Sequence, residues 1–254
     1  MIPLEDPTTL SLLFHLNSEP WLNDEAYQGG AMNQELKLPE RVMAEVPLPR
    51  PSGSALMDLL AHRRSYREFA QTEMPLEHVS ALLASGYGAI SAPRFGGQTP
   101  FLRRTVPSAG GLFPLELYVF TQRVQGLDDG LYHYDVVAHS LHQLRRENLF
   151  LTLEPMFYAY PFMKDANVVI AMAAVFLRTQ VKYGPRGYRY ILLEAGHVAQ
   201  NLCLRSMELG LESLCMGGFL DSALNELMGL KPKQEGVVYT VAAGFDSSKA
   251  LPPK

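Results

Sequence analysis

Apolar residues recur along much of the chain with a helical spacing. A first helix is expected from Ser54, where SALMDLLAHRR has this spacing and Ser54 is suited to cap the N-terminus. A second is expected over Pro75–Tyr87, with the proline in the first turn, where a missing N–H costs little. The longest, Gly187–Leu209, carries one apolar side and should stop at Gly210.

Other apolar runs have the pattern of strands. Leu115–Thr121 alternates and is rich in β-forming residues, and Gly130–Leu144 holds two short strand patterns divided by a turn. Val168–Phe176 is apolar throughout, which is typical of a central strand buried on both faces. SLCMGGF predicts a short strand that ends in a glycine pair, and Val237–Ala243 predicts a last buried strand.

Three segments are less regular. Leu149–Tyr160 is apolar and fits either a helix or a strand, and Asp221 is expected to cap a short helix over Ser222–Leu230. Residues 1–53 contain repeated prolines and an interrupted apolar pattern, so we expect an extended arm there, followed by one domain over residues 54–254. The arm either wraps its own domain or a partner subunit, or forms a partly disordered tail.

Composition and charge narrow the class of protein. The 254 residues, 47% of them hydrophobic and 19% charged, are enough to bury a core. The net charge of −4 gives no basic field for nucleic acid, and no apolar run reaches the roughly 18 residues of a membrane span. The N-terminus lacks the cationic region of a signal peptide. Cys203 and Cys215 are expected to be reduced core residues, so the sequence predicts a cytoplasmic enzyme without a metal site.

One polar segment interrupts the apolar pattern. Val181–Tyr190 reads VKYGPRGYRY and lies between two apolar elements. Its Gly-Pro pair excludes a regular strand, so we expect a polar loop, an element that often carries chemistry. Burial and the two nearby arginines would lower the pKa of Lys182, and Tyr183 would then relay a proton. An ordinary surface Lys-Tyr pair is the alternative.

A basic segment follows the first predicted helix. Arg63 and Arg67 are four residues apart in RRSYR and would share a helical face, with the Ser65 hydroxyl between them. Guanidinium pairs suit a phosphate, which accepts charge-assisted, bidentate hydrogen bonds. A solvated basic helix end, favoured by the helix dipole, fits the same residues.

Two glycine-rich loops would let the backbone approach a ligand. The first is PSAGGLFP, from Pro107 to Pro114, and the second is CMGGF, from Cys215 to Phe219. Adjacent glycines aim N–H groups at acceptors and suit the edge of a planar cofactor, although ordinary turns contain them too. The sequence has no G-x-G-x-x-G, Walker, G-x-S-x-G or H-E-x-x-H motif, which removes the best-known dinucleotide, triphosphate, hydrolase and zinc-protease sites.

The order of five motifs resembles one family, the nitroreductase-like flavoproteins of the SagB type. These McbC-like enzymes are the thiazoline and oxazoline dehydrogenases of peptide natural products. The motifs are RRSYREF, PSAGGLFPLELYV, GLYHYD, KYGPRGYRYILLEAGHVAQNL and GLESLCMGGF, and they cover about Leu56–Gly244. The resemblance implies an α+β, nitroreductase-like fold with a central, mostly antiparallel sheet flanked by helices. It also implies a dimer with FMN at the subunit interface.

The resemblance also assigns roles to residues. Lys182 and Tyr183 match the Lys-Tyr pair assigned to catalysis in azoline dehydrogenases, a pair that general nitroreductases lack. Many nitroreductases carry a basic residue just after the last strand, where this chain has Phe245-Asp246, so Lys249 is the remaining candidate there. The residues that match FMN-binding positions are Arg63, Arg64, Ser65, Arg67, Pro107, Ser108, Gly110, Gly217 and Gly218.

The implied reaction is a two-electron dehydrogenation. The azoline ring loses a proton to Lys182, assisted by Tyr183, and a hydride to FMN. The implied partners are a second copy of the chain and a peptide presented by a cyclodehydratase or a nonribosomal peptide synthetase, with no nucleic acid or membrane. Two other functions stay open: a general NAD(P)H-dependent nitro- or quinone reductase, and a flavin-bound scaffold subunit of a peptide-modifying complex.

Overall fold

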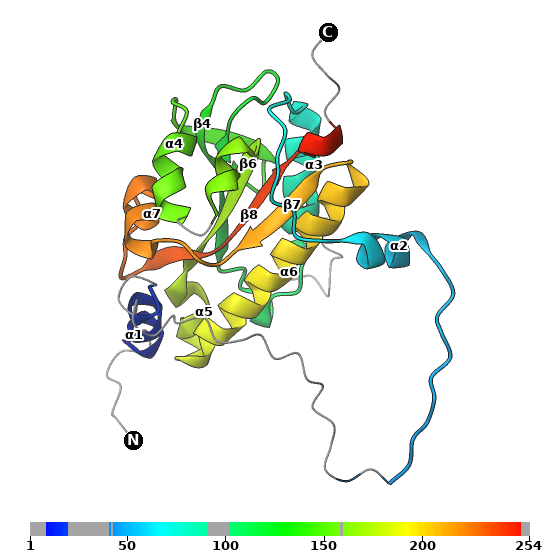
Figure 1. Ribbon diagram of the computed structural model, residues 1–254. Helices are drawn as coiled ribbons and strands as arrows, with labels where there is room; N and C mark the ends of the chain where they lie inside the picture. The colour runs from blue at the N-terminus through cyan, green and yellow to red at the C-terminus, as the bar shows by residue number, and fades with distance from the viewer. Residues whose placement is uncertain (1–8, 20–40, 42, 91–101, 158–159, 250–254) are drawn as a thin grey trace.

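One large sheet organises the chain (Figure 1). The computed structural model describes residues 9–19, 41, 43–90, 102–157 and 160–249. Antiparallel strands pair in the order β5-β4-β3-β6-β8-β7, while β1 (Ala89–Ile90) and β2 (Arg103–Arg104) form a separate short ladder. The strands of the large sheet are β3 (Leu115–Thr121), β4 (Gly130–Asp135), β5 (Ser140–Arg145), β6 (Val168–Val175), β7 (Glu212–Met216) and β8 (Glu235–Gly244).

Helices cover both faces of this sheet. One face packs against α3 (Leu76–Tyr87) and α6 (Arg186–Glu208). The other packs against α4 (Phe150–Leu153), α7 (Asp221–Met228) and the short 3-10 turns that follow α4. Every residue of β6 except its last is buried, because alternate side chains point into the two cores. The expected α+β architecture and the central buried strand are confirmed.

Two short helices decide between the expectations for the less regular segments. Leu149–Tyr160 starts as α4, so its helical alternative is right for these first residues. Asp221 is wrong as a cap: it is the first residue of α7, and Leu220 occupies the N-cap position without a side-chain capping hydrogen bond. Glu19 accepts hydrogen bonds from the backbone N–H and the hydroxyl of Ser222 at 2.9 and 2.7 Å instead. A carboxylate from another segment therefore satisfies the helix start.

The first predicted helix ends early. α2 (Ala55–His62) starts as expected, with Ser54 capping it through its side chain. Arg63 leaves the helical conformation with ψ of 127°, because the chain beyond it runs along β7, where Tyr66 N–H donates to a strand carbonyl at 3.1 Å. The expectation that Arg63 and Arg67 share a helical face is therefore wrong.

Val181–Tyr190 is not a loop. Its first residues end α5 (Phe176–Tyr183) and its last residues lie in α6. Gly184, with φ of 55°, closes α5, and Pro185 precedes the first turn of α6. A glycine after a helix and a proline before one are common boundary residues. The prediction of a polar loop is wrong because a Gly-Pro pair marks the junction of two helices as readily as a loop.

A further helix, α1 (Thr9–Asn17), lies within the expected arm and packs on the same chain beside α5 and α6 (Figure 1). Gln180 Nε2 donates to Ser11 Oγ at 2.6 Å, and His15 Nδ1 lies 3.1 Å from the Tyr188 hydroxyl. This part of the arm is thus a packed helix, and the division of the chain at residue 53 stays a prediction. None of the described helices combines the length and apolar character that a membrane span needs.

Ionisation of Asp221 is expected to weaken the docking of α1. Burial, helped by the charge of Glu19, raises the pKa of Asp221 to about 7, and His15 and Tyr188 face the same cluster. A carboxyl with a raised folded pKa contributes stability below its unfolded pKa of about 4 and loses it as the pH rises through about 7. The Tm of Asp221→Asn should therefore rise relative to that of the wild type as the pH increases between these two values. Each kcal/mol of difference in the free energy of unfolding corresponds to about 2–4 °C in Tm. Thermal unfolding of both proteins across pH measures this, and a pH-independent difference contradicts it.

Candidate active site

The glycine loop after Pro107 has an unusual backbone. Gly110 and Gly111 have φ of 64° and 66°, and Phe113 has φ of 46°. This left-handed region costs a residue with a Cβ about 1–2 kcal/mol, so contacts must hold the loop. Ser108 supplies one of them, since its Oγ accepts a hydrogen bond from Phe113 N–H at 2.9 Å.

The loop lies directly against the end of α5. A Cβ atom built on Gly110 would lie 2.7 Å from Tyr183 Oη and 2.9 Å from Lys182 Nζ. Real Cβ atoms essentially never come within 3.0 Å of a neighbour, so any Cβ here would force these two side-chain ends to move, and glycine leaves them in place. The structure thus brings together three residues that were expected in the site from separate parts of the sequence. We call them the loop–lysine cluster.

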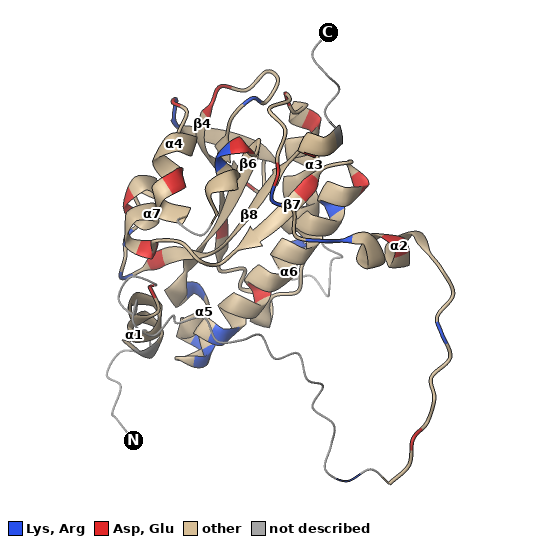
Figure 2. Cartoon of the chain, viewed as in Figure 1, with Lys and Arg blue, Asp and Glu red and all other residues tan. Residues whose placement is uncertain are grey.

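Lys182 and Tyr183 are presented at the surface of the chain. The Lys182 side chain is exposed, with Nζ 5.3 Å from the centroid of the Tyr183 ring. That ring packs edge-on against Tyr190, with 5.0 Å between centroids. Arg186 and Arg189 are exposed on the first turn of α6, and Figure 2 shows basic residues gathered where α5 meets α6. The expected burial of Lys182 is wrong for the single chain.

A buried polar group behind the loop was missed by the sequence reasoning. Glu194, on α6, is 2% exposed and accepts a hydrogen bond from the Tyr87 hydroxyl at 2.6 Å. Burial raises the pKa of Glu194, and burial together with the Glu194 charge raises that of Tyr87. The guanidinium carbon of Arg104 lies 4.2 Å from the centroid of the Tyr87 ring. The sequence did hold a signal, because Glu194 places a charge on the apolar side of the predicted long helix.

The basic segment, Arg63–Arg67, runs beside β7 near the C-terminal end of α6. Arg64 lies over the Tyr66 ring with its guanidinium carbon 5.8 Å from the centroid, and Arg67 Nη1 donates to the Ser65 carbonyl at 3.3 Å. The Tyr66 hydroxyl donates to Asp246, one of the two residues that follow the last strand. The segment is thus tied to the end of β8, and the side chain of Lys249 lies outside the described residues.

Two free thiols lie next to this segment. Cys203 Sγ and Cys215 Sγ are 3.4 Å apart, on α6 and β7. The hydrogen bond from Cys215 lowers the pKa of Cys203 to about 7, and the Arg63 guanidinium adds to this effect. Cys215 begins the second glycine loop, two residues before Gly217, so the Arg63 guanidinium, which also acts on the Cys215 thiol, lies near the start of that loop.

In the second glycine loop, the neighbouring protein atoms leave space for a Cβ at both glycines. A Cβ on Gly217 would contact the Tyr239 ring at 3.7 Å, and one on Gly218 would contact the Tyr160 ring at 3.5 Å. These are ordinary van der Waals distances, and neither glycine has a positive φ. The surrounding protein atoms therefore do not require glycine at either position.

Within the described part of one chain, no hydrogen bond, ion pair or ring contact joins the loop–lysine cluster to the basic segment. The cluster lies at the N-terminal end of α6 and the segment near its C-terminal end. At about 1.5 Å per residue, the 23 residues of α6 span roughly 34 Å. One chain therefore does not assemble all of the expected binding residues in one place.

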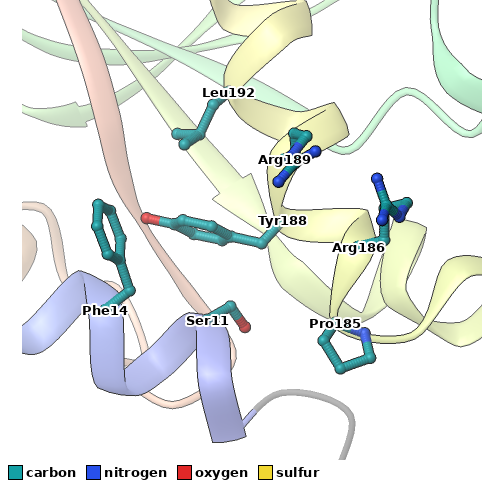
Figure 3. A pocket seen from close by; sticks show the side chains of 7 residues that line it. All are labelled: Ser11, Phe14, Pro185, Arg186, Tyr188, Arg189 and Leu192. Carbon is teal, nitrogen blue, oxygen red and sulfur yellow. The ribbon is translucent and has the colours of Figure 1, made fainter.

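A groove of about 650 Å³ opens between α1 and the first turns of α6 (Figure 3). Side chains from both helices converge on it, and the sequence reasoning missed it because it depends on where α1 docks. No group of three metal-binding side chains occurs in the ranges that the structure describes. The groove is lined by Ser11, Phe14, Pro185, Arg186, Tyr188, Arg189 and Leu192.

The antiparallel sheet with helices on both faces places the chain in a class, the α+β proteins of nitroreductase-like fold. The model of the family described as "Nitroreductase family" matches residues 60–245, and the chain belongs to this family of oxidoreductases.

Three relatives locate it further within the family. "Putative nitroreductase MJ1384" of Methanocaldococcus jannaschii is 35% identical over 187 residues, which cover 74% of this chain and 90% of that protein. "Microcin B17-processing protein McbC" of Escherichia coli is 26% identical over 149 residues, 56% of this chain and 53% of McbC. "Trifolitoxin-processing protein TfxB" of Rhizobium leguminosarum bv. trifolii is 26% identical over 165 residues, 63% of this chain and 44% of TfxB. The match spans about half the length of these two processing proteins, and the chain is McbC-like.

Solved structures share the fold. The E. coli microcin synthetase McbBCD complex with truncated pro-MccB17 contains a chain that matches with a TM-score of 0.72 at 18% identity, covering 97% of this chain and 94% of that one. A "putative nitroreductase in complex with FMN" from Desulfovibrio desulfuricans matches with a TM-score of 0.51 at 16% identity, covering 80% and 92%.

Proposed function

We propose that this chain is an FMN-dependent dehydrogenase that oxidises a thiazoline or oxazoline ring of a peptide or carrier-bound intermediate to the aromatic azole. The observation that carries the proposal is the close approach of Lys182 Nζ and Tyr183 Oη to the bare backbone of Gly110. A proton acceptor and a hydroxyl beside an open backbone suit removal of a proton from a flat ring. Two relatives, named as trifolitoxin- and microcin-processing proteins, support the same function.

The described residues fit a flavin mononucleotide. Gly217 and Gly218 are not required by the surrounding protein atoms, and a backbone without side chains suits the close approach of a planar ring system. Arg64 and Arg67 are exposed and carry the guanidinium groups that suit a phosphate. The structural neighbour from D. desulfuricans, described as an FMN complex, is consistent with this cofactor.

The chain's own residues would handle the proton. FMN, when bound, supplies the hydride-accepting chemistry. The Lys182 amine would accept the ring proton, and the Tyr183 hydroxyl beside it would orient the ring or pass the proton on. Lys182 is exposed in the free chain, so bound substrate would have to exclude water from it before the transfer.

We propose a homodimer with FMN between the subunits. α2 has no buried residue and exposes Leu56 and Leu60, and α6 exposes Leu192 and Leu193. Exposed apolar side chains of this number favour an interface in which a partner subunit buries them. A second copy would also let the loop–lysine cluster and the basic segment, which are separate within one chain, meet at one cofactor.

The substrate peptide would arrive from another protein. A cyclodehydratase or a nonribosomal peptide synthetase would form and present the azoline. The similar chain in the McbBCD complex belongs to an assembly solved with a truncated precursor, which supports a partner of the first kind.

A second function has one observation in its favour. MJ1384, named as a nitroreductase, shares 35% identity with this chain and is matched over 90% of its length. A general NAD(P)H-dependent nitro- or quinone reductase would use the same fold and cofactor. It would give the loop–lysine cluster no role in proton removal.

Purified protein is expected to be yellow and to convert a synthetic thiazoline or oxazoline peptide into a product about 2 Da lighter, through loss of two hydrogens to the flavin. The visible spectrum tests the cofactor, and mass spectrometry of the peptide tests the reaction. Rapid flavin reduction by NADPH without any azoline turnover would favour the nitroreductase alternative. A colourless protein that does not take up added FMN would contradict both functions.

A further inference from the structure

Two backbone N–H groups, one in the first glycine loop and one at the start of β3 directly after it, donate to side chains. Phe113 N–H donates to Ser108 Oγ at 2.9 Å, and Leu115 N–H donates to Tyr87 Oη at 3.3 Å. Pro114, between them, has no N–H. Each hydroxyl that accepts one of these bonds keeps a proton of its own, and that of the buried Tyr87 needs an acceptor in the protein.

One carboxylate faces both hydroxyls and accepts a hydrogen bond from that of Tyr87. Tyr87 Oη donates to Glu194 Oε1 at 2.6 Å, and the nearby Ser108 hydroxyl favours the ionised form of Glu194, lowering its pKa against the effect of burial. Glu194 and Tyr87 are 2% and 1% exposed, so water does not compete for the bond between them. An ionised carboxylate accepts at both oxygens, whereas an amide offers one oxygen and two donors. Glu194 therefore ends the hydrogen-bond chain that starts at Leu115 N–H, and it lies beside the Ser108 hydroxyl that accepts from Phe113 N–H.

The carbonyl side of the loop is held from α5. Arg178 Nη1 donates to the Phe113 carbonyl at 2.9 Å and pairs with Glu116 Oε1 at 2.7 Å. Arg178 is four residues before Lys182, about one turn earlier on the same helix. α5 thus carries both Lys182 and the side chain that holds the loop carbonyl, while α6 carries the acid that holds the loop N–H groups.

We infer that Glu194 is a positioning residue that sets the Gly110 loop against Lys182 and Tyr183, an inference that rests on the proposed function of that pair. Glu194 acts through Ser108 and Tyr87 and keeps Phe113 in its left-handed conformation. The other charged groups that face it are Arg104, from β2, and His197, from its own helix.

Amide hydrogen exchange tests this arrangement without using activity. In Glu194→Ala, the Phe113 and Leu115 amides should exchange about tenfold faster or more, since the acceptor Tyr87 loses its hydrogen-bond partner and the acceptor Ser108 loses the carboxylate beside it. In Tyr87→Phe, the Leu115 amide alone should speed up. Ser206→Ala is the matched control, because it removes a buried hydroxyl of α6 that bonds within that helix. Unchanged protection in Glu194→Ala and Tyr87→Phe, or equal acceleration in Ser206→Ala, would overturn the inference.

Kinetics test whether the position of the loop matters for the reaction. Glu194→Ala should lower kcat for azoline oxidation by about 10- to 100-fold while KM and FMN content stay near wild type, because a small displacement of reacting groups slows the step without removing binding. Glu194→Gln, which can accept from one hydroxyl, should fall between. A change in KM or FMN content with unchanged kcat would overturn the positioning role. If the wild type oxidises no azoline, the proposed function fails, and the exchange measurement alone still decides whether Glu194 holds the loop.

Discussion

Lys182→Ala is expected to keep FMN bound and to lose azoline oxidation by about 10²- to 10⁴-fold, the usual contribution of a general acid or base. The side chain is exposed and lies over the Tyr183 ring, so its truncation should change the stability of the protein little. Steady-state kinetics with mass detection of the product, the visible spectrum and the Tm measure activity, cofactor and folding separately.

Two further variants define what the lysine does. Lys182→Arg keeps a positive charge but does not serve as a proton acceptor, so it should be nearly as inactive as the alanine variant. Lys231→Ala removes an exposed lysine near α7, away from the loop–lysine cluster, and should behave as wild type. Full activity of Lys182→Ala would exclude the lysine from the chemistry. High activity of Lys182→Arg would show that its charge, and not proton transfer, is what the reaction needs.

The sequence predicted the sheet and the long helix well because their signals are local. β6 is apolar throughout, and α6 repeats its apolar side over many turns, so each pattern has one structural solution. α1 could not be predicted in this way. Its position depends on Gln180 and Tyr188, which lie far away in the sequence and contact it only in the folded chain, and Ser222 bonds Glu19 just after it.

The sequence predicted which residues belong to the candidate site better than it predicted how they are arranged. Lys182 and Tyr183 were expected in a loop, yet they end a helix, and their approach to Gly110 is a tertiary contact that no spacing reveals. Glu194 could have been identified from the sequence, since a charged residue on the buried face of a helix needs a partner. Its partner Tyr87 belongs to a different helix, so the hydrogen-bond chain itself could not be predicted from the sequence.

Gly110→Ala is expected to reduce azoline oxidation by about 100-fold while the chain still folds. The new Cβ would lie 2.7 Å from Tyr183 Oη and 2.9 Å from Lys182 Nζ, so these side-chain ends must move away from the loop. Displacement of a catalytic group by about 1 Å costs on the order of 100-fold in rate. The left-handed φ of 64° adds a loss of about 1–2 kcal/mol in the free energy of unfolding.

Gly126→Ala separates the steric effect from the backbone effect. Gly126 has φ of 73° and nothing within 4 Å of a built Cβ, so alanine there carries a similar strain without the collision. Urea unfolding should show a comparable loss of about 1–2 kcal/mol in both variants, because the strain is the same in kind. Only Gly110→Ala should lose kcat. An equal loss of activity in both would assign the effect to general destabilisation, and an active Gly110→Ala would mean that the reaction does not need Lys182 and Tyr183 against the loop.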